Sequence, residues 1–101
     1  MEISEPKIER KQILILQDDR FRPENVCIVS GAGTGIGRAT AVAAAANGLT
    51  TVGLDINEKE GKKTQQIARE MGGEMIFLRT DLTRDEDIEN AVKEAAKMGQ
   101  I

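Results

Sequence analysis

Short β-type runs alternate along most of the chain with longer stretches of helical periodicity. The three short runs are Val26–Val29, Thr51–Asp55 and Met75–Leu78. Runs of this length and composition predict strands that are buried on both faces of a sheet. Helices placed between such strands favour parallel pairing through crossover connections. The pattern therefore predicts an α/β fold, β-α-β-α-β-α, that forms half of a doubly wound parallel sheet with strand order 3-2-1.

The three helical stretches carry start signals and apolar stripes. The first runs from about Gly35 to Asn47 and is rich in alanine, the strongest helix former. Capping-box patterns at Asn57–Glu60 and Thr83–Glu86 open the second and third helices. The side chains expected to face the core are Ala39, Val42, Ala43 and Ala46 in the first helix, Thr64, Ile67, Ala68 and Met71 in the second, and Ile88, Ala91, Val92 and Ala95 in the third.

Residues 1–24 form an extension before the first predicted core strand. Charged side chains surround its one apolar run, Ile13–Leu16, which has the length of a strand. We therefore expect this run to supply an added strand. Pro23 then favours a turn into the core strand. Residues 25–101 make up the α/β domain itself.

A glycine-rich segment, Ser30–Gly37, lies between the first strand and the first helix. It matches neither the six-residue dinucleotide pattern nor the P-loop, but it fits Ser-Gly-x-x-x-Gly-x-Gly. Gly31 is expected to allow a tight exit from the strand where a side chain would clash. Gly35 would let the backbone approach a pyrophosphate, and Gly37 would let the helix pack on the strand. The first N–H groups of the helix would then face the phosphates.

This segment resembles the cofactor loop of the short-chain dehydrogenase/reductase family, with Ser30 in place of the more usual threonine. The resemblance extends over about Asn25 to Met98 and implies a Rossmann-type dinucleotide-binding domain, truncated to residues 25–101. The loop residues expected to contact the cofactor are Ser30, Gly31, Gly33, Thr34, Gly35, Ile36 and Gly37. Arg38 follows the loop, and we expect it to be an exposed helix arginine rather than a phosphate partner.

Asp55 closes the second strand, 18 residues after Gly37. An acid near this position accepts hydrogen bonds from the ribose hydroxyls of a dinucleotide. A carboxylate at ~4 Å from a 2′-phosphate costs roughly 4 kcal/mol at an effective dielectric of about 20. Neither the loop nor Ile56, also expected at the cofactor, supplies a basic side chain to offset this, so NAD is favoured over NADP. The alternative is that Asp55 is a solvated strand-end acid or a helix cap.

Asp81 and Leu82 follow the third strand. The family resemblance implies that this pair lines the adenine pocket of the cofactor. An Asp just before a helix is also a common helix cap, which is the alternative reading of this residue.

Charge and composition exclude several classes of partner and compartment. The net charge is −3 and the basic residues are scattered, so we expect no nucleic-acid partner. No apolar run reaches the roughly 20 residues of a membrane span, and the N-terminus does not resemble a signal peptide. The single cysteine, Cys27, lies in a predicted buried strand and is interpreted as a small core residue. These features favour a cytoplasmic protein without a membrane partner.

The chain contains no tyrosine and no histidine. The family's catalytic Ser and Tyr-x-x-x-Lys are therefore not expected here, and we predict neither a catalytic residue nor a metal site. The leading hypothesis is an NAD-binding N-terminal half of an oxidoreductase of this family, inactive on its own. The alternative is a non-enzymatic nucleotide-binding or interaction module that pairs through the exposed edge of strand Val26–Val29. Ile13–Leu16, a second copy or a complementing chain would cover that edge.

Overall fold

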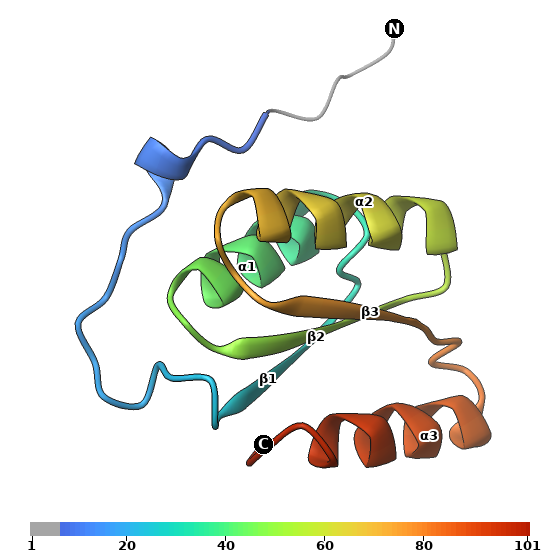
Figure 1. Cartoon of the computed structure of the whole chain (residues 1–101). Helices are drawn as coiled ribbons and strands as arrows, with labels where there is room; N and C mark the ends of the chain where they lie inside the picture. Colours follow the sequence, from blue (N-terminus) through green and yellow to red (C-terminus); the bar gives the residue numbers. More distant parts are fainter. Residues whose placement is uncertain (1–6) are drawn as a thin grey trace, which may run out of the picture.

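The computed structural model describes residues 7–101, whose centre is a three-stranded parallel sheet (Figure 1). Its strands are β1 (Val26–Ser30), β2 (Thr50–Asp55) and β3 (Met75–Arg79). They lie in the order β1-β2-β3, and β2 pairs in parallel with both neighbours. The predicted α/β class and the order 3-2-1 are confirmed. All three strands end at one edge of the sheet, where the loops that follow them meet.

Three helices cover the two faces of this sheet. They are α1 (Gly35–Ala46), α2 (Glu58–Glu70) and α3 (Asp85–Ala96). Figure 1 shows α1 and α2 together on one face and α3 alone on the other. Among residues 7–101, no helix has the length and apolar character needed to cross a membrane.

The sheet separates two hydrophobic clusters. The cluster under α1 and α2 includes Val42 and Met75, which are fully buried. The cluster under α3 includes Val52 and Leu54 from β2, together with Ala91 and Ala95 from the helix. Thr51 and Gly53 of β2, beside and between Val52 and Leu54, are buried as well, so this central strand is buried along most of its length.

The buried face of α1 agrees with the prediction at Val42 but otherwise differs from it. The buried residues are Arg38, Ala41, Val42 and Ala45, whereas Ala39 is exposed. In a helix made largely of alanine, apolar positions occur on every side, so the sequence offers little contrast from which to choose a face. The prediction for α2 is largely confirmed, because Thr64 and Ala68 are buried there.

The third helix also departs from expectation in two respects. Ala91 and Ala95 are buried as predicted, but Ile88 and Val92 remain exposed, and among residues 7–101 no second helix packs beside α3 on this face. The capping box predicted at Thr83–Glu86 is wrong. The residue before the helix is Arg84, and it makes no side-chain cap hydrogen bond.

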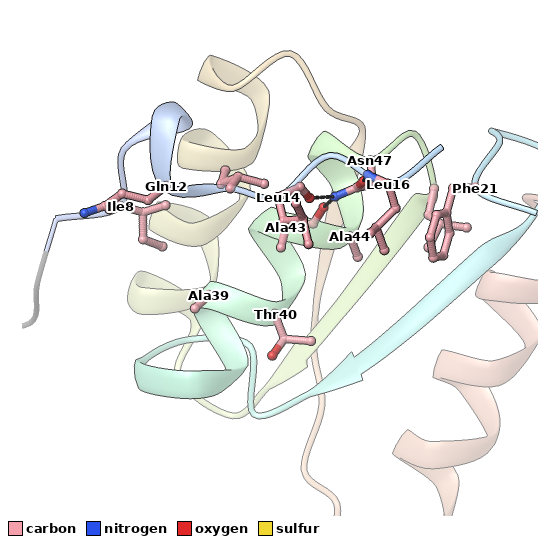
Figure 2. Close-up of a pocket in the computed structure, with 12 residues that line it drawn as sticks. Ile8, Gln12, Leu14, Leu16, Phe21, Ala39, Thr40, Ala43, Ala44 and Asn47 are labelled. Atoms are coloured by element: carbon pink, nitrogen blue, oxygen red, sulfur yellow. Dashed lines mark hydrogen bonds between the residues drawn. The ribbon is translucent and has the colours of Figure 1, made fainter. Parts of the chain in front are cut away.

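The N-terminal segment lies against α1 rather than adding to the sheet. Residues 1–6 of the predicted extension lie outside the described part of the chain. After a short 3-10 helix, η1 (Arg10–Gln12), the run Ile13–Leu16 forms no strand. The Asn47 side chain donates to the Leu14 carbonyl at 3.0 Å and accepts from the Leu16 N–H at 2.6 Å (Figure 2). The backbone of this run therefore hydrogen-bonds to the Asn47 side chain and not to a neighbouring strand. The run does not cover the outer edge of β1.

A groove of about 570 Å³ lies between this segment and the outer face of α1. Figure 2 shows its walls, with Leu14, Leu16 and Phe21 on one side and Ala43 and Ala44 on the other. The small alanine side chains of α1 leave this space.

Candidate functional site

The glycine loop after β1 requires Gly31 and Gly35 for their backbone angles and Gly37 for close packing. Gly31 and Gly35 have positive φ angles of +67° and +59°, which other residues rarely adopt. A Cβ on Gly31 would meet nothing within 4 Å, so its backbone angle, and not the predicted clash, requires glycine. A Cβ on Gly37 would lie 1.9 Å from the Gly31 carbonyl oxygen. Gly37 therefore allows the start of α1 to pack on the loop backbone.

The loop is joined to the end of β2 by two hydrogen bonds. The Ala32 N–H donates to the Leu54 carbonyl at 3.0 Å. The Gly33 N–H donates to Oδ2 of Asp55 at 2.9 Å. A Cβ on Gly33 would stand 2.7 Å from that oxygen, so only glycine fits without displacing the carboxylate. The structure thus brings together the two features that the sequence separates by 22 residues.

Asp55 is oriented by one backbone donor on each carboxylate oxygen. Oδ2 accepts from Gly33, and Oδ1 accepts from the Asn57 N–H at 2.9 Å. The side-chain cap of α2 is Asn57, which accepts from the Glu60 N–H at 3.1 Å. Asp55 is therefore not that cap, and its half-buried carboxylate faces the glycine loop. Each oxygen retains lone-pair capacity for a further donor.

The N-terminus of α1 opens beside this carboxylate. Its N-cap, Thr34, makes no side-chain cap hydrogen bond, and its first turn contains no acidic residue. The first N–H groups of a helix lack partners within the helix, and its dipole places partial positive charge there. This end of α1 is suited to hold an anion.

Arg38 is buried, which corrects the expectation of an exposed arginine. Only 4% of it is exposed. Its Nη2 donates to Glu60 Oε2 at 2.8 Å, and its Nε donates to Thr64 Oγ1 at 2.8 Å. The hydrogen bond from Arg38 to the Glu60 carboxylate is the main cause that lowers the pKa of Glu60. Glu60 and Thr64 were not predicted for this region, although their spacing of four residues places both on one side of α2.

Three exposed apolar side chains surround the carboxyl ends of the strands. Ile36 is 87% exposed at the start of α1, Ile56 follows β2, and Leu82 follows β3. All three lie in the segments that follow β1, β2 and β3, at the edge of the sheet where Asp55 lies, and exposed apolar side chains beside polar groups are a feature of binding surfaces.

Asp81, at the end of β3, is held in a local turn. Its Oδ1 accepts from the Thr83 hydroxyl at 2.6 Å and from the Thr83 N–H at 2.9 Å. These hydrogen bonds lower the pKa of Asp81 below its usual range. The Asp81 N–H donates to Asp87 Oδ2 at 2.9 Å, a contact that the sequence did not predict. Asp81 thus fixes the turn that presents Leu82.

The site contains binding groups rather than acid-base or nucleophilic groups. Burial raises the pKa of the Cys27 thiol, which packs against the cluster under α1 and α2. A raised pKa disfavours the reactive thiolate, in agreement with the interpretation of Cys27 as a core residue. What the described arrangement offers is a tight glycine loop, a helix N-terminus and an oriented carboxylate at the ends of parallel strands.

Comparison with known proteins relates this arrangement to a family. An uncharacterized oxidoreductase of Thermotoga maritima is 40% identical over 60 residues, which is 59% of this chain and 24% of that protein. A short chain dehydrogenase/reductase of Aspergillus oryzae is 40% identical over 68 residues, which is 66% of this chain and 26% of that protein. The chain thus spans about a quarter of the length of these relatives.

Solved structures of similar fold lead to the same family. A short chain dehydrogenase/reductase from Burkholderia phymatum in complex with NAD matches with a TM-score of 0.72 and 30% identity, over 78% of this chain and 28% of that one. An NAD⁺-bound xylitol dehydrogenase matches with a TM-score of 0.71 and 33% identity, over 78% and 30% of the two chains. The sequence model of short chain dehydrogenases matches residues 25–101. The chain therefore belongs to the short chain dehydrogenase family.

Proposed function

We propose that this chain is the NAD-binding N-terminal half of a short-chain dehydrogenase/reductase-type oxidoreductase. The observation that carries the proposal is the direct hydrogen bond between Gly33 of the loop and Asp55 at the end of β2. This contact supports the proposal because it joins the loop proposed to bind the phosphates to the carboxylate proposed to bind the ribose. When bound, the nicotinamide cofactor supplies the acceptor or donor of a hydride.

The loop and α1 bind the pyrophosphate in this proposal. Gly31 and Gly35 give the loop its tight path, and Gly37 brings α1 close to it. The backbone of Thr34 and Ile36 then faces the phosphates at the positive end of the helix. Ser30, which is exposed at the end of β1, lies at the entrance to this loop.

The carboxylate of Asp55 selects NAD over NADP. Its oxygens accept from the two ribose hydroxyls of the adenosine, whereas a 2′-phosphate would meet like charge. Its two backbone hydrogen bonds fix the direction of the carboxylate. Ile56, Leu82 and the turn of Asp81 form the walls on which the adenine base rests.

Titration calorimetry with NAD and with NADP tests this proposal. We expect NAD to bind more tightly than NADP, and Asp55→Ala to weaken NAD binding by about tenfold, the loss expected for a hydrogen-bonded charged group. Asp19→Ala is the matched control, because Asp19 is exposed in the N-terminal segment, and it should bind NAD as the wild type does. Equal NAD affinity in the wild type and Asp55→Ala would contradict the proposal.

The chain by itself is proposed to perform no hydride transfer. It contains no tyrosine and no histidine that could move the substrate proton. An assay of NADH formation with a panel of alcohols should therefore show no turnover. Turnover by the purified chain would overturn this part of the proposal.

A second candidate function is pairing through the outer edge of β1. Within residues 7–101 this edge carries one isolated parallel bridge, between Asn25 and Gln100. Val26 donates to Gln100 there, and alternate residues of a strand point to the same side, so the peptide groups of Ile28 face outward. Such an edge is suited to a parallel strand from a second copy or a complementing chain.

Amide hydrogen exchange measured at several protein concentrations tests this pairing. The Ile28 N–H should gain protection as the concentration rises, if a second copy binds. The Cys27 N–H is the internal control, because it faces β2 and should be protected throughout. Ile28 exchange that is independent of concentration, and of any added partner chain, would refute the pairing.

A further inference from the structure

The peptide group between Ala32 and Gly33 is held from both sides. Its carbonyl accepts from the Thr64 hydroxyl at 2.7 Å, and its N–H donates to Asp55 Oδ2 at 2.9 Å. Because a peptide group is planar, its C=O and N–H turn together. Any rotation that releases Thr64 therefore also moves the donor away from Asp55.

Arg38 determines the direction of the Thr64 hydroxyl. The Nε–H of Arg38 donates to Thr64 Oγ1 at 2.8 Å, so the oxygen acts as acceptor on that side. The single hydroxyl hydrogen is then directed to the Ala32 carbonyl, its shortest acceptor. All the hydrogen bonds from Arg38 to Asp55 thus point the same way, and bonds in such a chain strengthen one another.

Glu60 holds Arg38 in this orientation. Its carboxylate accepts from Arg38 Nη2 at 2.8 Å, and its backbone carbonyl accepts from the same nitrogen at 3.1 Å. The N–H of Glu60 is capped by Asn57, whose own N–H donates to the other oxygen of Asp55. The contacts therefore close a ring that starts and ends at the Asp55 carboxylate. Within the described residues no buried side-chain polar atom lacks a partner.

We propose that Arg38, Thr64 and Glu60, named here the Arg38 network, are positioning residues that orient the Ala32–Gly33 peptide and Asp55 and so set the selectivity between NAD and NADP. The inference rests on the proposed function for its nucleotide part. The network touches no part of the ligand; it acts through the peptide group and the carboxylate. Only the ribose end of the dinucleotide depends on the direction of Asp55, so the network affects selectivity more than overall affinity.

The test uses Thr64→Val in the full 101-residue chain. Valine keeps the shape of the buried side chain but removes the hydroxyl, so the Ala32 carbonyl loses its donor. Two-dimensional NMR without nucleotide should show an upfield move of the Gly33 amide proton, because its hydrogen bond to Asp55 weakens. Calorimetry should show that the ratio of NAD to NADP affinity falls by about fivefold, the size of a typical indirect effect.

Thr51→Val is the matched control. Thr51 is also fully buried, but its hydroxyl donates to the nearby Leu49 carbonyl at 3.2 Å and takes no part in the ring. It should leave both the Gly33 amide and the affinity ratio unchanged. If Thr64 had a merely structural role, Thr64→Val would lower the melting temperature, with Thr51→Val as the comparison, but would leave the Gly33 amide shift and the NAD to NADP affinity ratio unchanged.

A second pair of variants covers the case in which Thr64→Val does not fold. Glu60→Gln removes the charge that holds Arg38, whereas Glu58→Gln removes the charge of the exposed pair with Lys62 on the same turn. Only Glu60→Gln should move the Gly33 amide and the affinity ratio. An unchanged Gly33 amide in Glu60→Gln would overturn the inference. If the amide moves but no nucleotide binds to the wild type, the ring is upheld and the proposed function fails instead.

Discussion

Helices cover the two faces of the sheet to different extents. Under α1 and α2, two helices close over the cluster around Val42 and Met75, and the Arg38 network joins them through buried hydrogen bonds. On the other face α3 packs alone, and Ile88 and Val92 stay exposed. The residues of the Arg38 network, which we propose to orient the nucleotide site, therefore belong to the more completely covered face. The α3 face is less completely covered, because Ile88 and Val92 remain exposed on it.

The largest expected effect comes from Gly37, on the closed face. Gly37→Ala forces a Cβ against the Gly31 carbonyl, a backbone group that cannot move aside without opening the loop. We expect a loss of about 3 kcal/mol in the free energy of unfolding, at the upper end for overpacked sites. Urea denaturation measures it.

Gly35→Ala is the control for that substitution. Gly35 has open space around its missing Cβ and only its positive φ to oppose a side chain. Gly35→Ala should lower the free energy of unfolding by about 1 kcal/mol, the penalty for a side chain in left-handed backbone. Equal losses in the two variants would show that the close approach at Gly37 is not what stabilises the loop.

The same substitution, valine to alanine, compares the two faces of the sheet directly. Val42 in α1 is fully buried, whereas Val92 in α3 is 46% exposed. Val42→Ala should cost about 2 kcal/mol, through lost burial and the cavity it leaves. Val92→Ala should cost less than about 0.5 kcal/mol, as for other surface changes. Similar losses, measured by urea denaturation at low protein concentration, would mean that α3 is covered in solution and that the two faces do not differ.

A smaller effect is expected from pH, through Glu60. Hydrogen bonding to Arg38 lowers the folded-state pKa of Glu60 below its ordinary value of 4.5. Its contribution to stability is therefore complete above that ordinary value, and it is lost as the pH falls through the folded-state pKa. The difference in urea midpoint between the wild type and Glu60→Gln should shrink as the pH is lowered from 7 to below 4.5.

Glu58→Gln provides the comparison for this pH series. Glu58 pairs with Lys62 on the exposed side of α2, and such pairs contribute little. Its difference from the wild type should stay near zero across the series. A Glu60→Gln difference that is equally flat would contradict the role given to the pair with Arg38.

Most of the fold could be predicted from local signals. The strands and helices lie within one or two residues of their expected bounds, since glycine and Asn57 mark their ends. The order of the strands follows from the alternation of elements. The buried face of α1 could not be predicted, because alanine offers no contrast between one side of a helix and another. The run Ile13–Leu16 was misread because strand length alone does not supply a partner strand.

The candidate site was predictable in its residues but not in its connections. The glycine spacing identified the loop, and the strand end identified Asp55, yet the hydrogen bond between them spans 22 residues. Arg38 was read as exposed because its partners, Glu60 and Thr64, come from another helix. Such contacts depend on how α1 and α2 pack on the sheet, which no local pattern specifies.

The most direct test of the central claim is an NMR titration of the chain with NAD. If NAD binds as proposed, the amides of Gly31 to Gly37, together with those of Asp55 and Ile56, should shift progressively and saturate. NADP should produce smaller shifts at the same concentrations. Amides that shift only along the groove beside α1, or none that shift at all, would contradict the claim that this loop and Asp55 form a dinucleotide site.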